Sequence, residues 1–295
     1  MAITNVVDEG KIFIQSLDGF VPDGVRAKVS MLRLDTMHPL ISGNKWYKLK
    51  YNIVIAKSKK APSIVTFGGA YSNHLIATAA AAMNAGIPSV GIVRGLQDEE
   101  NLNSVLLKCK EMGMELQFVS REAYSLRDQD IFLDDVDYRY PNSYVIPEGG
   151  ANIAGQIGAG EIATLIPEEY THILLSVGSG TTFIGLRNTL PAFQHLFGFV
   201  PMKNGTYLNN EISTSLFPLQ NKKWELTDRF HFGGFGKITS EIQEFMPQFE
   251  ARYGFPLDRV YTAKMMLGLQ EMLAERAFSE NAEILCIHSG GLTGN

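Results

Sequence analysis

Short runs of β-branched and apolar residues alternate along this chain with longer stretches of helical periodicity. Three runs have the composition of buried strands, at 63–67, 89–93 and 114–119. Helical patterns lie between them, over 73–85 and 102–112, and each ends at a glycine. Such alternation is typical of right-handed crossovers in a parallel sheet, and it predicts a compact lobe over about residues 49–154.

A second series follows the break at residues 147–152. Its predicted members are helix 157–165, strand 172–177, helix 183–190, helices 240–253 and 261–277, and strand 283–288. The two series predict an α/β protein with two lobes, each a three-layer αβα arrangement on a mainly parallel twisted sheet. We expect a larger domain formed by residues 1–48 and 155–295, and a smaller βαβ domain over 49–154.

Composition narrows the function classes. The chain has 295 residues, 45% of them hydrophobic, and a formal charge of −5 without a long basic run, so a nucleic-acid partner is not expected. Its two cysteines, Cys109 and Cys286, fall in apolar patterns and support neither a disulfide framework nor a thiolate metal site. No stretch of 18 uninterrupted apolar residues and no hydrophobic leader occurs, so we expect a cytoplasmic protein without membrane spans.

Three glycine turns carry the candidate chemistry. Ser42-Gly43-Asn44-Lys45 precedes an amphipathic stretch, while the turns that begin at Gly68 and Gly178 each follow a predicted strand and open a predicted helix. Strand-to-helix turns of this kind present backbone N–H groups to anions. Together the turns indicate an aldehyde cofactor that carries a phosphate.

Lys45 would lie at the start of a buried helix, because Trp46, Leu49 and Ile53 fall on one face. Desolvation there lowers the pKa of an ammonium group and favours the free amine that attacks aldehydes. Lys48, one turn later, either faces the same pocket as a counter-charge for phosphate or is an exposed helix lysine.

The second and third turns each allow two interpretations. The segment Gly178-Ser179-Gly180-Thr181-Thr182 either surrounds a monophosphate or makes a tight connection without a ligand. Ser72 and Asn73 either cap the next helix or receive a substrate carboxylate, and His74 is expected to be a structural histidine.

In this order the turns resemble one family, the fold type II pyridoxal-phosphate enzymes that comprise D-cysteine desulfhydrase and 1-aminocyclopropane-1-carboxylate deaminase. The resemblance covers most of the chain. The matching motifs are Gly43-Asn44-Lys45 with Lys48, Ser72-Asn73, Gly178 to Thr182, Val260-Tyr261-Thr262, and His288-Ser289-Gly290-Gly291.

The resemblance implies how pyridoxal 5'-phosphate would be held. Lys45 would carry it covalently, and Lys48 and residues 178–182 would bind its phosphate. Asn73 would touch the ring hydroxyl. Ser289 would lie near the pyridine nitrogen, where a neutral hydroxyl leaves the ring uncharged and favours prompt expulsion of a leaving group.

Substrate residues follow from the same resemblance. Ser72 would contribute a catalytic or carboxylate-binding hydroxyl, Tyr261 would donate a proton or assist the leaving group, and His74 would adjoin the substrate. Phe235 stands where the family commonly has a substrate-facing tyrosine, and Thr262 stands where the deaminases have an acidic residue. Residues 199–226 also differ from the family pattern.

We therefore expect β-elimination of a small amino acid of the D-cysteine type, giving pyruvate, ammonia and sulfide, in a homodimer. Four alternatives remain open at this point: deamination of the cyclopropane amino acid, a D-serine dehydratase or racemase-like reaction, a non-catalytic protein that binds the cofactor or an anion, and a nucleotide-binding α/β protein.

Overall fold

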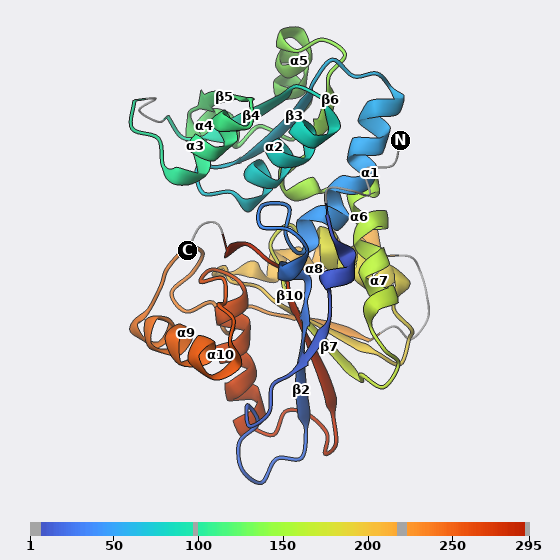
Figure 1. Ribbon diagram of the computed structural model, residues 1–295, viewed down its shortest axis with the longest axis vertical. Coiled ribbons are helices and arrows are strands. Elements are labelled where there is room, and N and C mark those ends of the chain that lie inside the picture. The colour runs from blue at the N-terminus through green and yellow to red at the C-terminus, as the bar shows by residue number, and fades with distance from the viewer. Residues whose placement is uncertain (1–6, 97–99, 217–222, 293–295) are drawn as a thin grey trace.

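The computed structural model describes residues 7–96, 100–216 and 223–292. Its elements form two lobes, each built on one sheet (Figure 1). Helix α1 (Asn44–Ser58) runs from the lower lobe of that view toward the upper one. Residues 217–222, which belong to the segment that differs from the family pattern, lie outside the described residues.

The smaller sheet has four parallel strands in the order β5-β4-β3-β6. Val65 and Phe67 point to one face and pack with Tyr124 and Phe132, whereas Val93 on the neighbouring strand packs on the other face with helices α2 and α3. The sheet is therefore the middle of three layers. The elements are β3 (Ile64–Gly69), α2 (Asn73–Ala85), β4 (Ser89–Arg94), α3 (Ser104–Glu111), β5 (Met114–Val119), α4 (Arg121–Tyr124), α5 (Asp130–Arg139) and β6 (Tyr144–Ile146).

The larger sheet has six strands in the order β1-β2-β10-β7-β8-β9, with β1 antiparallel to β2 and the other neighbours parallel. Leu285 and Ile287 face one core, and Ile284 and Cys286 face the other. The strands are β1 (Ile14–Ser16), β2 (Lys28–Arg33), β7 (His172–Ser176), β8 (His195–Phe199), β9 (Trp224–Thr227) and β10 (Glu283–His288). Helices α1, α7 (Thr181–Thr189) and α8 (Leu208–Ser215) contribute to the first core, and α9 (Ser240–Tyr253) and α10 (Thr262–Ala274) to the second.

The strands and helices predicted from periodicity are present, with ends that differ by a few residues. The predicted helix 157–165 is instead α6 (Ile153–Gly160), followed by a 3-10 helix, η5 (Glu161–Leu165). Strands β1, β2, β6, β8 and β9 were not predicted. All of them except β2 have at most five residues, which gives too few alternations to register as a pattern. The expected domain boundary between residues 48 and 49 falls within α1, and the division into domains stays a prediction.

Helix α6 packs closely against the two helices that lead into the candidate site. A Cβ atom at Gly158 would overlap the carbonyl oxygen of Tyr47 on α1, and one at Gly185 on α7 would overlap that of Gln156 on α6. Glycine is needed here for close backbone approach, even though it is a poor helix former. These contacts hold α1 and α7 at a set distance from each other.

We predict that Gly158→Ala lowers the free energy of unfolding by about 2 kcal/mol, because overpacking outweighs the gain in helix propensity. Urea denaturation would measure the change. Gly10→Ala is the matched control, because its methyl group would meet only the exposed Asp8 side chain. Equal stability of the two variants would contradict the prediction.

Candidate active site

The candidate site lies where several chain segments leave their sheets. The turn after β3 leads into α2, the turn after β7 leads into α7, and the chain after β10 reaches Ser289-Gly290-Gly291. The carboxyl ends of parallel strands are the usual location of ligand sites in α/β folds. The amino end of α1 joins them, since the backbone N–H of Asn44 donates to the carbonyl oxygen of Ser289 at 3.3 Å.

Lys45 is half-buried on the first turn of α1, and its amine donates to Asn44 Oδ1 at 2.7 Å. Burial lowers the pKa of this amine to about 8, although the charge of Asp258 acts in the opposite direction. About a tenth of the amine is therefore unprotonated at pH 7, far more than for an unperturbed lysine. The direction of the shift agrees with the expectation from the sequence.

Asn44 links the amine to the turn after β7, because its Nδ2 donates to Thr182 Oγ1 at 3.0 Å. Lys48 lies deeper, is only 5% exposed, and donates from Nζ to the carbonyl oxygen of Gly149 at 2.9 Å. Its Nζ is also 3.5 Å from Ser179 Oγ. The alternative that Lys48 is an exposed helix lysine is therefore wrong. Burial, and next the charge of Lys45, hold its pKa well below the usual value.

The turn from Gly178 to Gly180 forms a small cradle at the amino end of α7. Gly180 has a φ of +74°, and a Cβ atom at Gly178 would come within 3.4 Å of the Tyr261 hydroxyl. Ser179 Oγ and Thr181 Oγ1 are 2.9 Å apart. First-turn N–H groups, two hydroxyls and the nearby Lys48 give this cradle the donors that a phosphate needs.

The turn after β3 brings the smaller lobe to the same place. Ser72 caps α2, with its Oγ accepting from the N–H groups of His74 at 3.2 Å and Leu75 at 3.3 Å, so the capping interpretation is confirmed. Asn73 adjoins the C-terminal turn, since a Cβ atom at Gly291 would lie 2.9 Å from Asn73 Nδ2. Ser72 and Asn73, which are predicted to contact the substrate, therefore lie on a turn next to that of Ser289, which is predicted to lie near the pyridine nitrogen.

His74 is buried, and its Nε2 is 2.9 Å from Thr66 Oγ1. At Nε2 it is therefore the hydrogen-bonded structural histidine that the sequence predicts. Thr66 Oγ1 itself donates to the carbonyl oxygen of Ile146, which makes His74 Nε2 the donor in their bond. Within the described part of the chain, His74 Nδ1 and Thr262 Oγ1 are buried atoms without a hydrogen-bond partner.

Tyr261 immediately precedes α10 and packs edge-on against Phe235, with ring centroids 5.9 Å apart. Burial raises the pKa of the Tyr261 phenol, with smaller effects of Asp258 and Glu148, so the phenol stays protonated and is able to donate a proton. Phe235 is 51% exposed and places a hydrocarbon edge where the family commonly has a hydroxyl.

Sequence reasoning missed two polar residues that support Tyr261 and Phe235. Asp258 Oδ1 accepts from the N–H groups of Val260 at 3.1 Å and Tyr261 at 2.6 Å, and burial raises its pKa to about 6. Lys264 is 1% exposed and donates to the carbonyl oxygens of His231 and Gly234, which holds the chain before Phe235. An aspartate just before a helix was a usable signal for the first, whereas Lys264 resembles any helix lysine.

These residues fit a phosphate-bearing aldehyde. The half-buried Lys45 amine is able to attack a carbonyl group, the cradle at residues 178–182 is able to hold an anion, and the buried atoms His74 Nδ1 and Thr262 Oγ1 lack protein partners in the described structure. In the described residues no group of three or more histidine, cysteine, aspartate or glutamate side chains is arranged to bind a metal ion.

Comparison with known proteins agrees with this fit. The family model described as "Pyridoxal-phosphate dependent enzyme" matches residues 23–290. The chain therefore belongs to the pyridoxal-phosphate dependent enzymes.

Its curated relatives define a narrower branch. A putative 1-aminocyclopropane-1-carboxylate deaminase of Pyrococcus horikoshii is 32% identical, over 92% of this chain and 86% of the relative. The mitochondrial bifunctional D-cysteine desulfhydrase/1-aminocyclopropane-1-carboxylate deaminase of Arabidopsis thaliana is 30% identical, over 86% of this chain and 70% of the relative. The chain is thus a member of the deaminase and desulfhydrase branch of the family.

Solved structures agree on the fold. The crystal structure of a homologue of 1-aminocyclopropane-1-carboxylate deaminase superposes with a TM-score of 0.81 at 28% identity, over 96% of this chain and 90% of the other. O-ureido-L-serine synthase shares the fold at 12% identity with a TM-score of 0.71, over 99% of this chain and 92% of the other. The predicted fold class, a two-lobed α/β fold with mainly parallel sheets as in the fold type II enzymes, is confirmed, and it is the tryptophan synthase beta-like fold. Within the described ranges no helix is long and apolar enough to cross a membrane.

We predict that Asp258→Asn stabilises the protein above about pH 6. Because burial raises the pKa of this carboxyl from 3.8 to about 6, the unfavourable buried charge is absent below about pH 4 and fully present above about pH 6. The gain in unfolding free energy should grow over this window to about 2–3 kcal/mol, and Asn keeps the acceptor for the two N–H groups.

Urea unfolding of variant and wild type at several pH values would measure this gain. Asp137→Asn, an exposed change on α5, is the control and should alter stability little at any pH. A gain in unfolding free energy for Asp258→Asn that does not depend on pH would contradict the cost assigned to burying the Asp258 charge.

Proposed function

We propose that this chain is a pyridoxal-phosphate dependent lyase that deaminates a small amino acid by β-elimination, with D-cysteine giving pyruvate, ammonia and sulfide. The observation that carries the proposal is the half-buried Lys45 amine, with a pKa near 8, beside a phosphate cradle and a protonated Tyr261. The names of the relatives include both a desulfhydrase and a deaminase, so the reaction class rests on the residues of the site.

In this proposal Lys45 holds the cofactor covalently. Residues 178–182 and Lys48 bind its phosphate, Asn73 contacts its ring hydroxyl, and Ser289 lies near its pyridine nitrogen. The bound cofactor supplies an electron sink for the carbanion at Cα. Every other step depends on protein groups.

The protein groups bind the substrate and move protons. The substrate carboxylate would replace Ser72 Oγ as the acceptor for the N–H groups of His74 and Leu75. Ser72 would then donate its hydroxyl to the carboxylate, and His74 would border it. The Lys45 amine would take the proton from the substrate Cα, a role suited to a pKa near the working pH. Tyr261 would assist the departing thiolate with a hydrogen bond from its protonated phenol, and the released aminoacrylate would take up water to give pyruvate and ammonia.

Two residues favour elimination over opening of a cyclopropane ring. Phe235 offers no hydroxyl to the substrate, and Thr262 is a neutral buried residue where the deaminases have an acid. Deamination of the cyclopropane amino acid is the second candidate, supported by the names of the relatives. Assembly into a homodimer stays a prediction.

We predict that the purified protein has a visible absorption band from bound cofactor, and that borohydride bleaches the band and leaves the cofactor on Lys45. Lys45→Ala should abolish the band and reduce turnover by at least about 1,000-fold, because both the attachment and the base are lost. Mass spectrometry of the reduced protein locates the attachment. Lys57→Ala, an exposed change on the same helix, is the control. Attachment at another lysine would overturn the assignment.

We predict that the enzyme forms pyruvate and sulfide from D-cysteine and turns over the cyclopropane amino acid at least about 100-fold more slowly. A rate loss of this size is expected when one acid–base group is missing from a site. Phe235→Tyr should raise that slower turnover about tenfold or more by restoring a phenol. Assays of pyruvate, ammonia and sulfide with D-cysteine, L-cysteine and D-serine would compare the substrates. Phe193→Tyr, another half-exposed phenylalanine, is the control. Faster ring opening than elimination by the wild type would favour the second candidate.

A further inference from the structure

Two turns interlock at the centre of the site. The first, residues 38–43, leads into Lys45, and the second is Ser289-Gly290-Gly291. The N–H of Gly291 donates to Ser42 Oγ at 3.4 Å, while a Cβ atom at Gly43 would overlap the Ser289 carbonyl. Both Gly43 and Gly290 have positive φ, at +63° and +75°. The positions of Lys45 and Ser289 are therefore set by how these two turns hold their shape.

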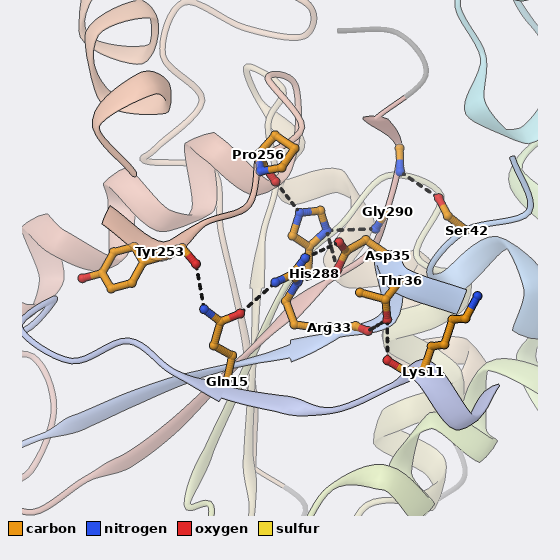
Figure 2. Close-up of polar contacts among 11 residues, drawn as sticks. Lys11, Gln15, Arg33, Asp35, Thr36, Ser42, Tyr253, Pro256, His288 and Gly290 are labelled. Atoms are coloured by element: carbon orange, nitrogen blue, oxygen red, sulfur yellow. Dashed lines mark hydrogen bonds and ion pairs between the residues drawn. The ribbon is translucent and has the colours of Figure 1, made fainter. Parts of the chain in front are cut away.

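His288 holds the second turn from behind (Figure 2). Its side chain is completely buried, with Nε2 3.0 Å from the carbonyl oxygen of Pro256 and Nδ1 3.2 Å from the backbone N of Gly290. A carbonyl oxygen only accepts and a backbone N–H only donates, so both bonds form together when the proton is on Nε2 and Nδ1 is bare. Protonation of Nδ1 would leave the Gly290 N–H without its acceptor.

His38 holds the first turn in the same way. Its Nδ1 lies 3.0 Å from the backbone N of Leu40 and 2.9 Å from that of Ile41, and both N–H groups donate to it. The imidazole is half-buried, and burial lowers its pKa. The first turn thus also requires a histidine with an unprotonated Nδ1, here that of His38.

The charges around His288 also suit a neutral ring. Asp35 Oδ1 lies 3.8 Å from His288 Nδ1, but both Asp35 oxygens accept from the Arg33 guanidinium at 2.8 and 2.7 Å. Arg33 therefore balances Asp35 without a second cation. Burial is the largest effect on His288 and lowers its pKa, and Arg33 acts in the same direction, whereas Asp35 and the Pro256 carbonyl oppose them.

We propose that His38 and His288 are a pair of positioning residues that, as neutral imidazoles with the proton on Nε2, lock the two turns that present Lys45 and Ser289 to the cofactor. Both rings accept hydrogen bonds from the backbone of their turns, and His288 is held in place by Pro256, so the two histidines act on the site through the turns. The consequence for cofactor binding rests on the proposed function, whereas the tautomers and the order of the turns do not.

The first test examines the wild-type protein by NMR with ¹⁵N-labelled imidazoles at about pH 7.5. Both His38 and His288 should show a protonated Nε2 and an unprotonated Nδ1. Single His→Asn variants at the two positions assign the signals by their loss. A proton on Nδ1 of either ring would overturn the proposal for that turn.

The second test separates the two ring nitrogens by substitution. In His288→Asn the amide oxygen approximates Nδ1 and keeps the acceptor for Gly290, whereas in His288→Gln the amide nitrogen approximates Nε2 and keeps only the bond to Pro256. We expect the Asn variant to bind pyridoxal phosphate within about threefold of the wild type and the Gln variant about tenfold or more weakly, the effect of one unpaired buried N–H. His38→Asn and His38→Gln should show the same order.

His172→Asn, a half-buried change on β7 at the other end of the sheet, controls for loss of a histidine. Hydrogen exchange of the Gly290 amide, which needs no cofactor, should be faster in His288→Gln than in His288→Asn. Equal exchange and equal affinity in the two variants would overturn the proposal. Faster exchange in a protein that binds no cofactor would instead refute the proposed function and leave the role of the histidines intact.

Discussion

The close approach of two backbone turns is the constraint on which this site depends. Gly43 and Gly290 both have positive φ, and a side chain at Gly43 would collide with the Ser289 carbonyl. Because α1 begins at this contact, Lys45 takes its place from the end of β10 rather than from its own helix alone. Helix α6 then fixes α1 relative to α7, which aligns the amine with the phosphate cradle.

Three buried cations in the described chain donate to neutral carbonyl oxygens, whereas the buried Arg33 pairs with the Asp35 carboxylate. Lys48 donates to Gly149, Lys264 donates to His231 and Gly234, and Arg187 donates to several carbonyl oxygens, including those of Leu190 and Pro191. Carbonyl partners satisfy the N–H groups without cancelling the charge. Lys48, next to the cradle, therefore has no counter-ion among these partners, and its pKa is held low; an anion bound in the cradle would raise that pKa and favour the charged ammonium.

Local sequence predicted the parts of the site that lie on glycine turns. The turns at Gly43, Gly68 and Gly178 could be identified because each combines a strand or helix pattern with residues that only a turn requires. Asp258 was missed although its bonds to Val260 and Tyr261 are local. The roles of Lys264 and Asn44 were not predicted, since they depend on residues distant in sequence, such as Thr182 for Asn44. The edge strands β1 and β9 were not predicted for a similar reason, because their few residues form strands through pairing with β2 and β8.

The residues proposed to hold the cofactor's aldehyde carbon, phosphate and ring nitrogen belong to one lobe, and those proposed to receive the substrate carboxylate belong to the other. Lys45, residues 178–182 and Ser289 are attached to the six-stranded sheet or to the start of α1, whereas Ser72 and Asn73 follow a strand of the four-stranded sheet. A hinge motion between the lobes would therefore admit an amino acid or release its products while the coenzyme kept its proposed attachments to Lys45, residues 178–182 and Ser289. Such a division of labour allows one coenzyme molecule to serve many turnovers without being exposed to loss in each cycle.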